Sequence, residues 1–217
     1  MAVSLKKGQG VRLKKEGSNE GLKSITLGLR WDSTKTIRTE KPQGFFSKLM
    51  GKETEYTERK VKKSIDLDSS ILVCKNEKVV GRCFFGNLNL SLRGKQIAWH
   101  LGDDRSGSDK KTKKDNEQIK VNLSNISLND ADELYLVVNA FSYGITFDEI
   151  TESVATIYGE DGVTPLATFD FTNEAEFKGK TGAIVGKAYY NNGWQFEAIG
   201  TPVMANRLEE FDKYITK

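Results

Sequence analysis

Hydrophobic residues along this chain alternate with polar ones in many short runs, which is the pattern of half-buried β-strands. Asn, Asp and Gly separate these runs, and a new run begins about every ten residues. Short strands at this spacing favour an all-β fold, and we expect a β-sandwich. The runs expected to form strands are 3–5, 11–15, 24–32, 65–74, 78–85, 117–126, 133–141, 153–160, 166–172, 183–191 and 194–200.

Two segments depart from the strand pattern and predict helical structure. Residues 146–150 begin with Thr146 and carry Glu149 three positions later, as in a capping box, so we expect a short helical turn there. Residues 202–217 predict an amphipathic C-terminal helix that packs on the sandwich, and a partner-binding helix is the alternative interpretation. One face of this helix would carry Met204, Leu208, Phe211 and Ile215.

We interpret residues 1–217 as one domain that is interrupted by an exposed basic insertion, residues 33–63. The insertion contains nine basic and four acidic residues and breaks the expected run of strands. Within it, the sequence GFFSKLMG (44–51) is a small apolar island. This island would either cover an edge of a sheet or act as a docking motif.

The composition is that of a folded domain, with 37% hydrophobic and 10% aromatic residues. No apolar run approaches the roughly 20 residues that span a bilayer. The N-terminal sequence MAVSLKKGQGVRLKK has no apolar signal core, so we expect a cytoplasmic protein.

A tight turn at residues 76–77 would place Cys74 opposite residue 79 and not opposite Cys83. We therefore expect two reduced thiols.

The net charge of +3 is unevenly distributed along the chain. Residues 1–120 carry 27 basic and 15 acidic side chains, a net of +12, whereas residues 121–217 carry 6 and 15, a net of −9. Either each face of the protein meets a partner of opposite sign, or the two halves interleave and the division has no functional meaning.

The sequence lacks the motifs of familiar catalytic sites. It contains no glycine-rich phosphate loop, and no nucleophile lies in a recognisable motif with His100, the single histidine. We expect His100 to be a hydrogen-bonded structural residue and the protein not to be an enzyme. One histidine and two cysteines cannot build a usual zinc site, so any metal would be a hard cation that prefers oxygen ligands.

Two aspartates interrupt an otherwise apolar strand in the sequence SIDLDSSILVC, residues 64–74. Alternation along a strand places Asp66, Asp68 and Ser70 on one face, with Ile65 and Leu67 on the other. Two such carboxylates start about 6.6 Å apart, close enough to share one calcium ion if they lean together. Alone, a pair of this kind is more often a solvated face.

A second acidic run, residues 100–123, follows as a loop and a strand. An EF-hand does not fit, because counting from Asp66 puts Ile71 where that loop requires glycine. Instead, the two runs predict a calcium site in which the strand pair faces an acidic loop. The loop offers Asp103, Asp104, Asp109, Asp115 and Glu117.

In order and spacing, several motifs resemble the TerD family of tellurium-resistance and stress proteins, a group of calcium-binding β-sandwiches. The resemblance covers nearly the whole chain, and the apolar island is similar to the TerZ and TerX branch. Its most specific part is DLD, followed by an H-x-G-D loop and then by EQIKV. The motifs are LKSITLGLRWD, IDLDSS, HLGDDRSG, DNEQIKVNLSNI, ELYLVVNAF and GWQFEAIG.

The resemblance implies a non-enzymatic calcium-binding protein. Its acidic loop, once ordered by calcium, would form a partner-binding surface. The resemblance also implies partners within the same stress-resistance system, including membrane-associated ones. Two calcium ions are typical of the family, but the loop after residue 107 is longer here and carries lysines, so we expect one good site. The implied ligands are Asp66, Asp68, Asp103, Asp115 and Glu117, with Asp104 where the family usually has Asn.

Two other functions are compatible with the sequence. The first is a binding module for an anionic membrane surface or nucleic acid. Nucleic acid is not expected, because the lysines lack interleaved aromatic residues for base stacking. The second is a hydrolase that uses Asp66 and Asp68 as acid and base, although they lie too close for an inverting mechanism. The binding module would use the basic insertion and Lys110, Lys111, Lys113 and Lys114.

Overall fold

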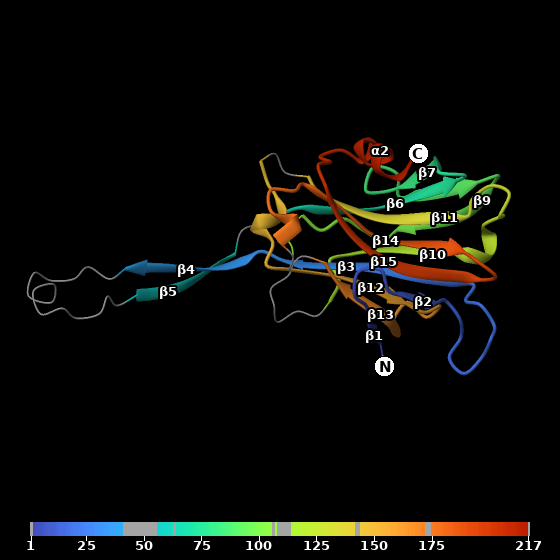
Figure 1. Ribbon diagram of the computed structural model, residues 1–217, viewed down its shortest axis with the longest axis horizontal. Coiled ribbons are helices and arrows are strands. Elements are labelled where there is room, and N and C mark those ends of the chain that lie inside the picture. The colour runs from blue at the N-terminus through green and yellow to red at the C-terminus, as the bar shows by residue number, and fades with distance from the viewer. Residues whose placement is uncertain are drawn as a thin grey trace, which may run out of the picture.

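The computed structural model is a β-sandwich of two sheets, from which a long hairpin extends away (Figure 1). The structure describes residues 2–40, 56–62, 64–105, 107, 114–141, 144–171 and 175–216. The predicted fold class is therefore confirmed. The sequence pattern had missed the short strands β8 and β9, residues 89–92 and 95–100.

The strands are antiparallel to their neighbours, except that β1 runs parallel to β13. The first sheet has seven strands in the order β1 (Val3–Ser4), β13 (Pro165–Asp170), β12 (Glu152–Tyr158), β3 (Ser24–Asp32), β10 (Glu117–Asn122), β9 (Lys95–His100) and β8 (Asn89–Leu92). The second sheet has six in the order β2 (Gly10–Arg12), β15 (Trp194–Val203), β14 (Gly182–Tyr190), β11 (Glu133–Ala140), β6 (Leu67–Lys75) and β7 (Lys78–Cys83).

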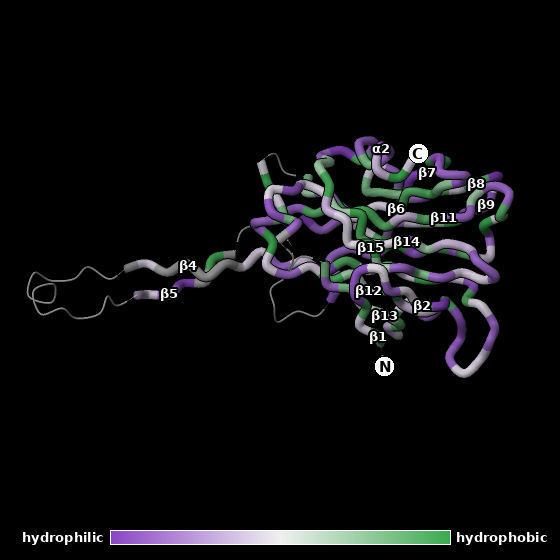
Figure 2. The backbone as a smooth tube through the Cα atoms, in the orientation of Figure 1, coloured by the Kyte–Doolittle hydropathy of each residue, from purple (hydrophilic) through white to green (hydrophobic). Residues whose placement is uncertain are grey.

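The main core lies between the two sheets, where the apolar faces of their strands meet. Strand β10 shows the expected alternation, with Ile119 and Val121 buried in the core and Lys120 on the outer face. Strand β6 is buried on both faces, because the C-terminal segment covers its outer side. In Figure 2 the hydrophobic colour accordingly gathers on β6 and β11.

The helical structure near the C-terminus is shorter than the predicted helix over 202–217. Residues 202 and 203 still belong to β15, and a 3-10 turn, η4 (Leu208–Phe211), leads into the short helix α2 (Asp212–Ile215). The apolar periodicity is kept for three of the four predicted positions, since Leu208, Phe211 and Ile215 pack over Leu72 and Cys74 of β6. Met204 precedes the turn and is exposed.

The basic insertion contains strands that the sequence analysis did not predict. Strands β4 (Thr34–Glu40) and β5 (Tyr56–Lys62) pair as an antiparallel ribbon that leaves the sandwich (Figure 1). At the base of this ribbon, the indole N–H of Trp31 donates a hydrogen bond of 2.9 Å to the carbonyl of Ile65, and both residues are fully buried. The apolar island 44–51 lies outside the described residues.

Smaller predictions agree with the structure only in part. The turn η2 (Phe147–Glu149) forms as expected, but Thr146 donates its hydroxyl to Asp148 and makes no side-chain cap. Cys74 and Cys83 are free and buried, and Cys74 lies opposite Val79 as expected. Among the described residues, no helix is long and apolar enough to cross a membrane.

The close approach of β14 and β15 gives a test of the packing. A Cβ atom on Gly186 would lie 2.5 Å from the Phe196 ring and 2.7 Å from the carbonyl oxygen of Glu197. Overpacking of this kind typically costs about 1–3 kcal/mol. Gly186→Ala should therefore lower the free energy of unfolding by about that amount in urea titrations. Gly21→Ala is the matched control, because its nearest neighbouring atom is 3.9 Å away, and an equal loss in both variants would contradict the packing.

Candidate metal centre

Three aspartates meet where β6 begins and where the loop after β9 passes it. Each of Asp66, Asp68 and Asp103 offers one carboxylate oxygen, and these oxygens all lie within 4.8 Å of one another. Asp68 is buried, Asp66 is half-buried and Asp103 is exposed. The side chains are therefore graded from the interior to the solvent, as an ion-binding site with an open side requires.

Alternation along β6 explains why these carboxylates are turned away from the main core. Ile65 and Leu67 lie in the core between the sheets. Asp68 and Ser70 instead line a small cavity of about 180 Å³ on the other face of the strand, together with Phe141. The predicted division of this strand into an apolar and an acidic face is thus confirmed.

Two oxygens of the cluster have no hydrogen-bond partner among the described residues. Asp66 Oδ1 and Asp68 Oδ2 are buried and accept no hydrogen bond from the residues that the structure describes. Burying a carboxylate oxygen without a hydrogen-bond partner costs free energy. Such an oxygen in a folded protein is therefore expected to interact with another group, such as an ion. A cation bound among the three aspartates would supply that group, and the donor set fits a hard metal ion.

The electrostatics of the cluster disfavour three negative charges without a cation. Burial, with the neighbouring carboxylates Asp66, Glu117 and Asp103 adding to it, raises the pKa of Asp68 to about 7. Burial and the charge of Asp103 likewise raise the pKa of Asp66 to about 6. Arg105 opposes these shifts and donates a hydrogen bond of 3.0 Å to Asp103, but it is 80% exposed and compensates the cluster only weakly.

Glu117 fastens the acidic loop to β6 but is not one of the three clustered residues. Its Oε2 accepts hydrogen bonds from the backbone N–H of Ser69 (2.8 Å) and from the Ser69 hydroxyl (2.7 Å). Its Oε1 accepts the N–H of Asp104 at 3.4 Å, and His100 Nε2 lies 3.5 Å from Oε2. His100 is buried in this network, which agrees with the structural role expected for it.

Asp104 lies beside the cluster and belongs to a neighbouring hydrogen-bond chain. The amide of Asn116 donates to Asp104 Oδ2 at 2.9 Å, and the amide oxygen of Asn116 accepts the backbone N–H of Trp31 at 3.1 Å. This chain positions the loop against the end of β3. Asp109, which the sequence analysis also named, lies outside the described residues.

Asp115 is a predicted ligand that the structure places apart from the cluster. Its carboxylate turns to the outer face of the first sheet, where Gln118 donates to Oδ2 at 2.9 Å and Tyr158 also hydrogen-bonds to it. The space above Gly28, which has no side chain, accommodates this carboxylate. Strand β10 begins only at Glu117, so strict alternation does not hold two residues earlier.

One buried acidic residue was not singled out from the sequence. Asp32 ends β3 and is fully buried, and its Oδ1 accepts the N–H of Thr34 at 2.8 Å. Its Oδ2 accepts no hydrogen bond from any described residue. The sequence signal was an aspartate directly after the apolar run that ends in Trp31.

Comparison with known proteins places this architecture in a family. The profile of the TerD domain matches residues 1–214. The chain belongs to the TerD family. Two curated relatives are 29% identical to this chain. General stress protein 16U of Bacillus subtilis (strain 168) aligns with 93% of this chain and 91% of its own length. Tellurium resistance protein TerX of Serratia marcescens aligns with 93% of each chain.

A solved structure shares the fold of this chain. A homologue of telluride resistance protein (TerD) from Streptomyces coelicolor A3(2) aligns with a TM-score of 0.57 at 17% identity. The alignment covers 88% of this chain and 96% of the other. This likeness concerns the fold alone, and the match to the TerD domain confirms the family resemblance that the sequence motifs indicated.

The raised pKa of Asp68 predicts how stability depends on pH when a chelator removes metal ions. The carboxyl group has a pKa near 3.8 in the unfolded chain and about 7 in the folded protein. The unfolded state therefore releases this proton first, and stability is lost as the pH rises from about 4 to 7. Relative to Asp68→Asn, which cannot titrate, the wild type should lose up to about 4 kcal/mol of unfolding free energy across that range. Parallel pH profiles for the two proteins would contradict this assignment.

Proposed function

We propose that this TerD-family protein is a non-enzymatic, calcium-binding stress-response protein of the tellurium-resistance type. The observation that supports calcium is a pair of buried oxygens, one on Asp66 and one on Asp68, that accept no hydrogen bond from the described residues. A third carboxylate, from Asp103, lies within reach of them. Membership in the family and the names of its relatives support a role in stress or tellurium resistance.

Calcium suits this donor set better than the other common ions. All the clustered atoms are carboxylate oxygens, which calcium prefers, whereas the usual zinc sites include histidine nitrogen or cysteine sulfur. Magnesium demands a nearly ideal octahedron and gives up its waters reluctantly, whereas calcium tolerates an irregular site. Asp103 is exposed, so water can complete the coordination from its side.

The ligands in this proposal are Asp66, Asp68 and Asp103, with Glu117 as the residue that positions the loop. An ion held by all three aspartates would tie the loop that follows β9 to the start of β6. Within the described part of this loop, Glu117 accepts the N–H of Asp104, Asn116 donates to the Asp104 carboxylate, and Ser64 donates to the carbonyl of Arg105. Calcium would thus order a surface at this end of the sandwich for a partner to recognise.

The proposed partners are other proteins of the same stress-resistance system, including membrane-associated ones, and the proposed location is the cytoplasm. The alternative of an anionic partner depends on the lysine-rich loop. Of its four lysines, only Lys114 lies within the described residues, and it is exposed. Its contribution stays a prediction that salt-dependent binding to acidic vesicles would test.

Calcium should stabilise the fold. An ion at 100 times its dissociation constant adds about 2.7 kcal/mol, which corresponds to roughly 5–11 °C in Tm for a domain of this size. Calorimetric titration of the chelator-stripped protein and thermal unfolding with and without calcium would measure both quantities. Magnesium should do much less. Identical melting curves in chelator and in millimolar calcium would overturn the proposal.

The structure separates the predicted ligands into two groups that mutation can distinguish. Asp68→Asn should weaken calcium binding at least tenfold, because it removes a charged oxygen from the cluster. Asp115→Asn should change calcium affinity less than twofold, because that carboxylate faces the outer side of the first sheet. Both variants change one Asp to Asn, so each controls for the other. Equal losses of affinity would show that Asp115 turns into the site.

A further inference from the structure

A second cavity lies on the outer face of the second sheet, remote from the metal centre. It has a volume of about 440 Å³. Asn76 and Glu77 line it and follow the C-terminal end of β6, whereas Asp68 lies near the beginning of that strand. The nine residues of β6 span about 30 Å at 3.3 Å per residue, so the two sites are separate. The proposed calcium function does not use this cavity.

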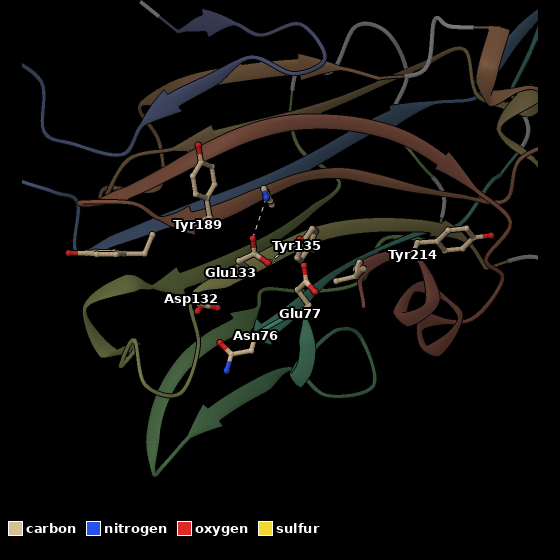
Figure 3. A pocket seen from close by; sticks show the side chains of 10 residues that line it. Asn76, Glu77, Asp132, Glu133, Tyr135, Tyr189 and Tyr214 are labelled. Atoms are coloured by element: carbon tan, nitrogen blue, oxygen red, sulfur yellow. Dashed lines mark hydrogen bonds and ion pairs between the residues drawn. The ribbon is translucent and has the colours of Figure 1, made fainter. Parts of the chain in front are cut away.

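Tyrosines form much of the wall of this cavity. Figure 3 shows Tyr135 and Tyr189 on adjacent strands with Glu133 beside them, and Tyr214 on the side of the C-terminal helix. Strand register explains the grouping, because Glu133 lies opposite Tyr189 and Tyr135 lies opposite Lys187. Residues far apart in the sequence thus present several aromatic rings to one hollow.

Lysine ammonium groups of the chain itself already lie against these tyrosine rings, so the rings accommodate cations. Lys187 Nζ lies 5.1 Å from the ring centre of Tyr189 and 5.9 Å from that of Tyr135, distances typical of cation–π contacts. The same ammonium lies 3.2 Å from Glu133 Oε1, and the Tyr135 hydroxyl donates to Glu133 Oε2 at 3.1 Å. Lys213 Nζ lies 4.9 Å from the ring centre of Tyr214.

The carboxylates of the wall outnumber its cations. Glu77, Asp132 and Glu133 contribute three negative charges, whereas Lys187 in the wall and Lys75, which pairs with Asp132, contribute two positive charges, a net of −1. Asp132 is held by Lys75, whose Nζ lies 2.7 Å from Oδ2, but its side chain keeps 34% of its exposure. Aromatic faces combined with excess negative charge attract an organic cation and repel an anion.

We propose that this cavity binds the lysine or arginine side chain of a basic polypeptide segment. A guanidinium group suits it especially, because its flat face stacks on tyrosine while its edge donates to two carboxylates. Lys187 occupies part of the same environment and therefore competes with the ligand. The site is a protein-recognition site, independent of calcium.

One source of such a segment is the basic insertion, residues 33–63, on a second copy of this chain. Residues 33–63 carry nine basic and four acidic residues. The strands β4 and β5 precede β6 and extend away from the sandwich (Figure 1). The cavity, in contrast, is lined by Asn76 and Glu77, which directly follow the C-terminal end of β6. A basic segment on a different protein is the other source with the same chemistry.

The binding experiment uses two small probes that differ only in charge. Nα-acetyl-arginine methylamide should shift the NMR signals of Tyr214 and Ile215 in the full-length protein. Nα-acetyl-citrulline methylamide, which is neutral and of nearly the same shape, should bind at least about fivefold more weakly. Equal shifts with both probes, or no shifts with the arginine probe up to tens of millimolar, would overturn the proposal.

Two variants should change the affinity for the arginine probe in opposite directions. Asp132→Asn combined with Glu133→Gln should weaken binding about fivefold or more, by removing two charges from the wall. Lys187→Met should tighten binding severalfold, because it removes the competing ammonium and keeps an apolar side chain against the rings. Asp170→Asn with Glu176→Gln is the control, since both residues are exposed and Asp170 belongs to the first sheet. Unchanged affinity in both test variants would refute the site.

Sedimentation equilibrium then distinguishes the two sources of the basic segment. Self-association that disappears both in the Asp132/Glu133 variant and after Arg59→Glu with Lys60→Glu supports the second copy as ligand. A protein that stays monomeric but binds the arginine probe supports the site and assigns the segment to another protein. Self-association that persists in the Asp132/Glu133 variant would exclude this cavity as its cause.

Discussion

The hydrogen bonds between Glu117 and Ser69 join the two sheets at the end of the sandwich that carries the acidic cluster. Glu117 opens β10 in the first sheet, and Ser69 belongs to β6 in the second. Both residues are buried, so these bonds form in a low-dielectric environment where a charged acceptor gains most from its donors. Because Glu117 also accepts the N–H of Asp104, the same carboxylate sets the distance between the acidic loop and Asp68.

The acidic cluster places mutually repelling carboxylates beside β6, a strand that is held in place by its neighbours. The aspartates repel one another, yet Asp68 cannot move away because β6 is paired on both sides, with β11 and β7. Asp103 lies in a loop and is free of strand pairing. An added cation would therefore act mainly on the loop, while the strand would provide a fixed half of the site. This division explains how one end of a stable sandwich can change without any change in the core.

The sequence predicted those features that depend on local alternation or on the order of motifs. Period-two patterning holds throughout β10 and at the start of β6, where it places Asp66 and Asp68 on the face opposite Ile65 and Leu67. Asp115 could not be placed, because the register before β10 depends on the room above Gly28 in another strand. The ribbon of β4 and β5 was missed because two strands that pair only with each other need no apolar alternation. The tyrosine-lined cavity combines β11, β14 and α2, and only the folded chain shows that combination.

The buried contact between Trp31 and Ile65 has a consequence for the evolution of this chain. It closes the base of the β4–β5 ribbon inside the core, so the packing of the sandwich at this point does not depend on the rest of the ribbon. The entropy of closing a loop grows only with the logarithm of its length, and most of that cost is independent of what the loop contains. Nature can therefore lengthen, shorten or exchange the ribbon as a module, while the family fold below it stays constant.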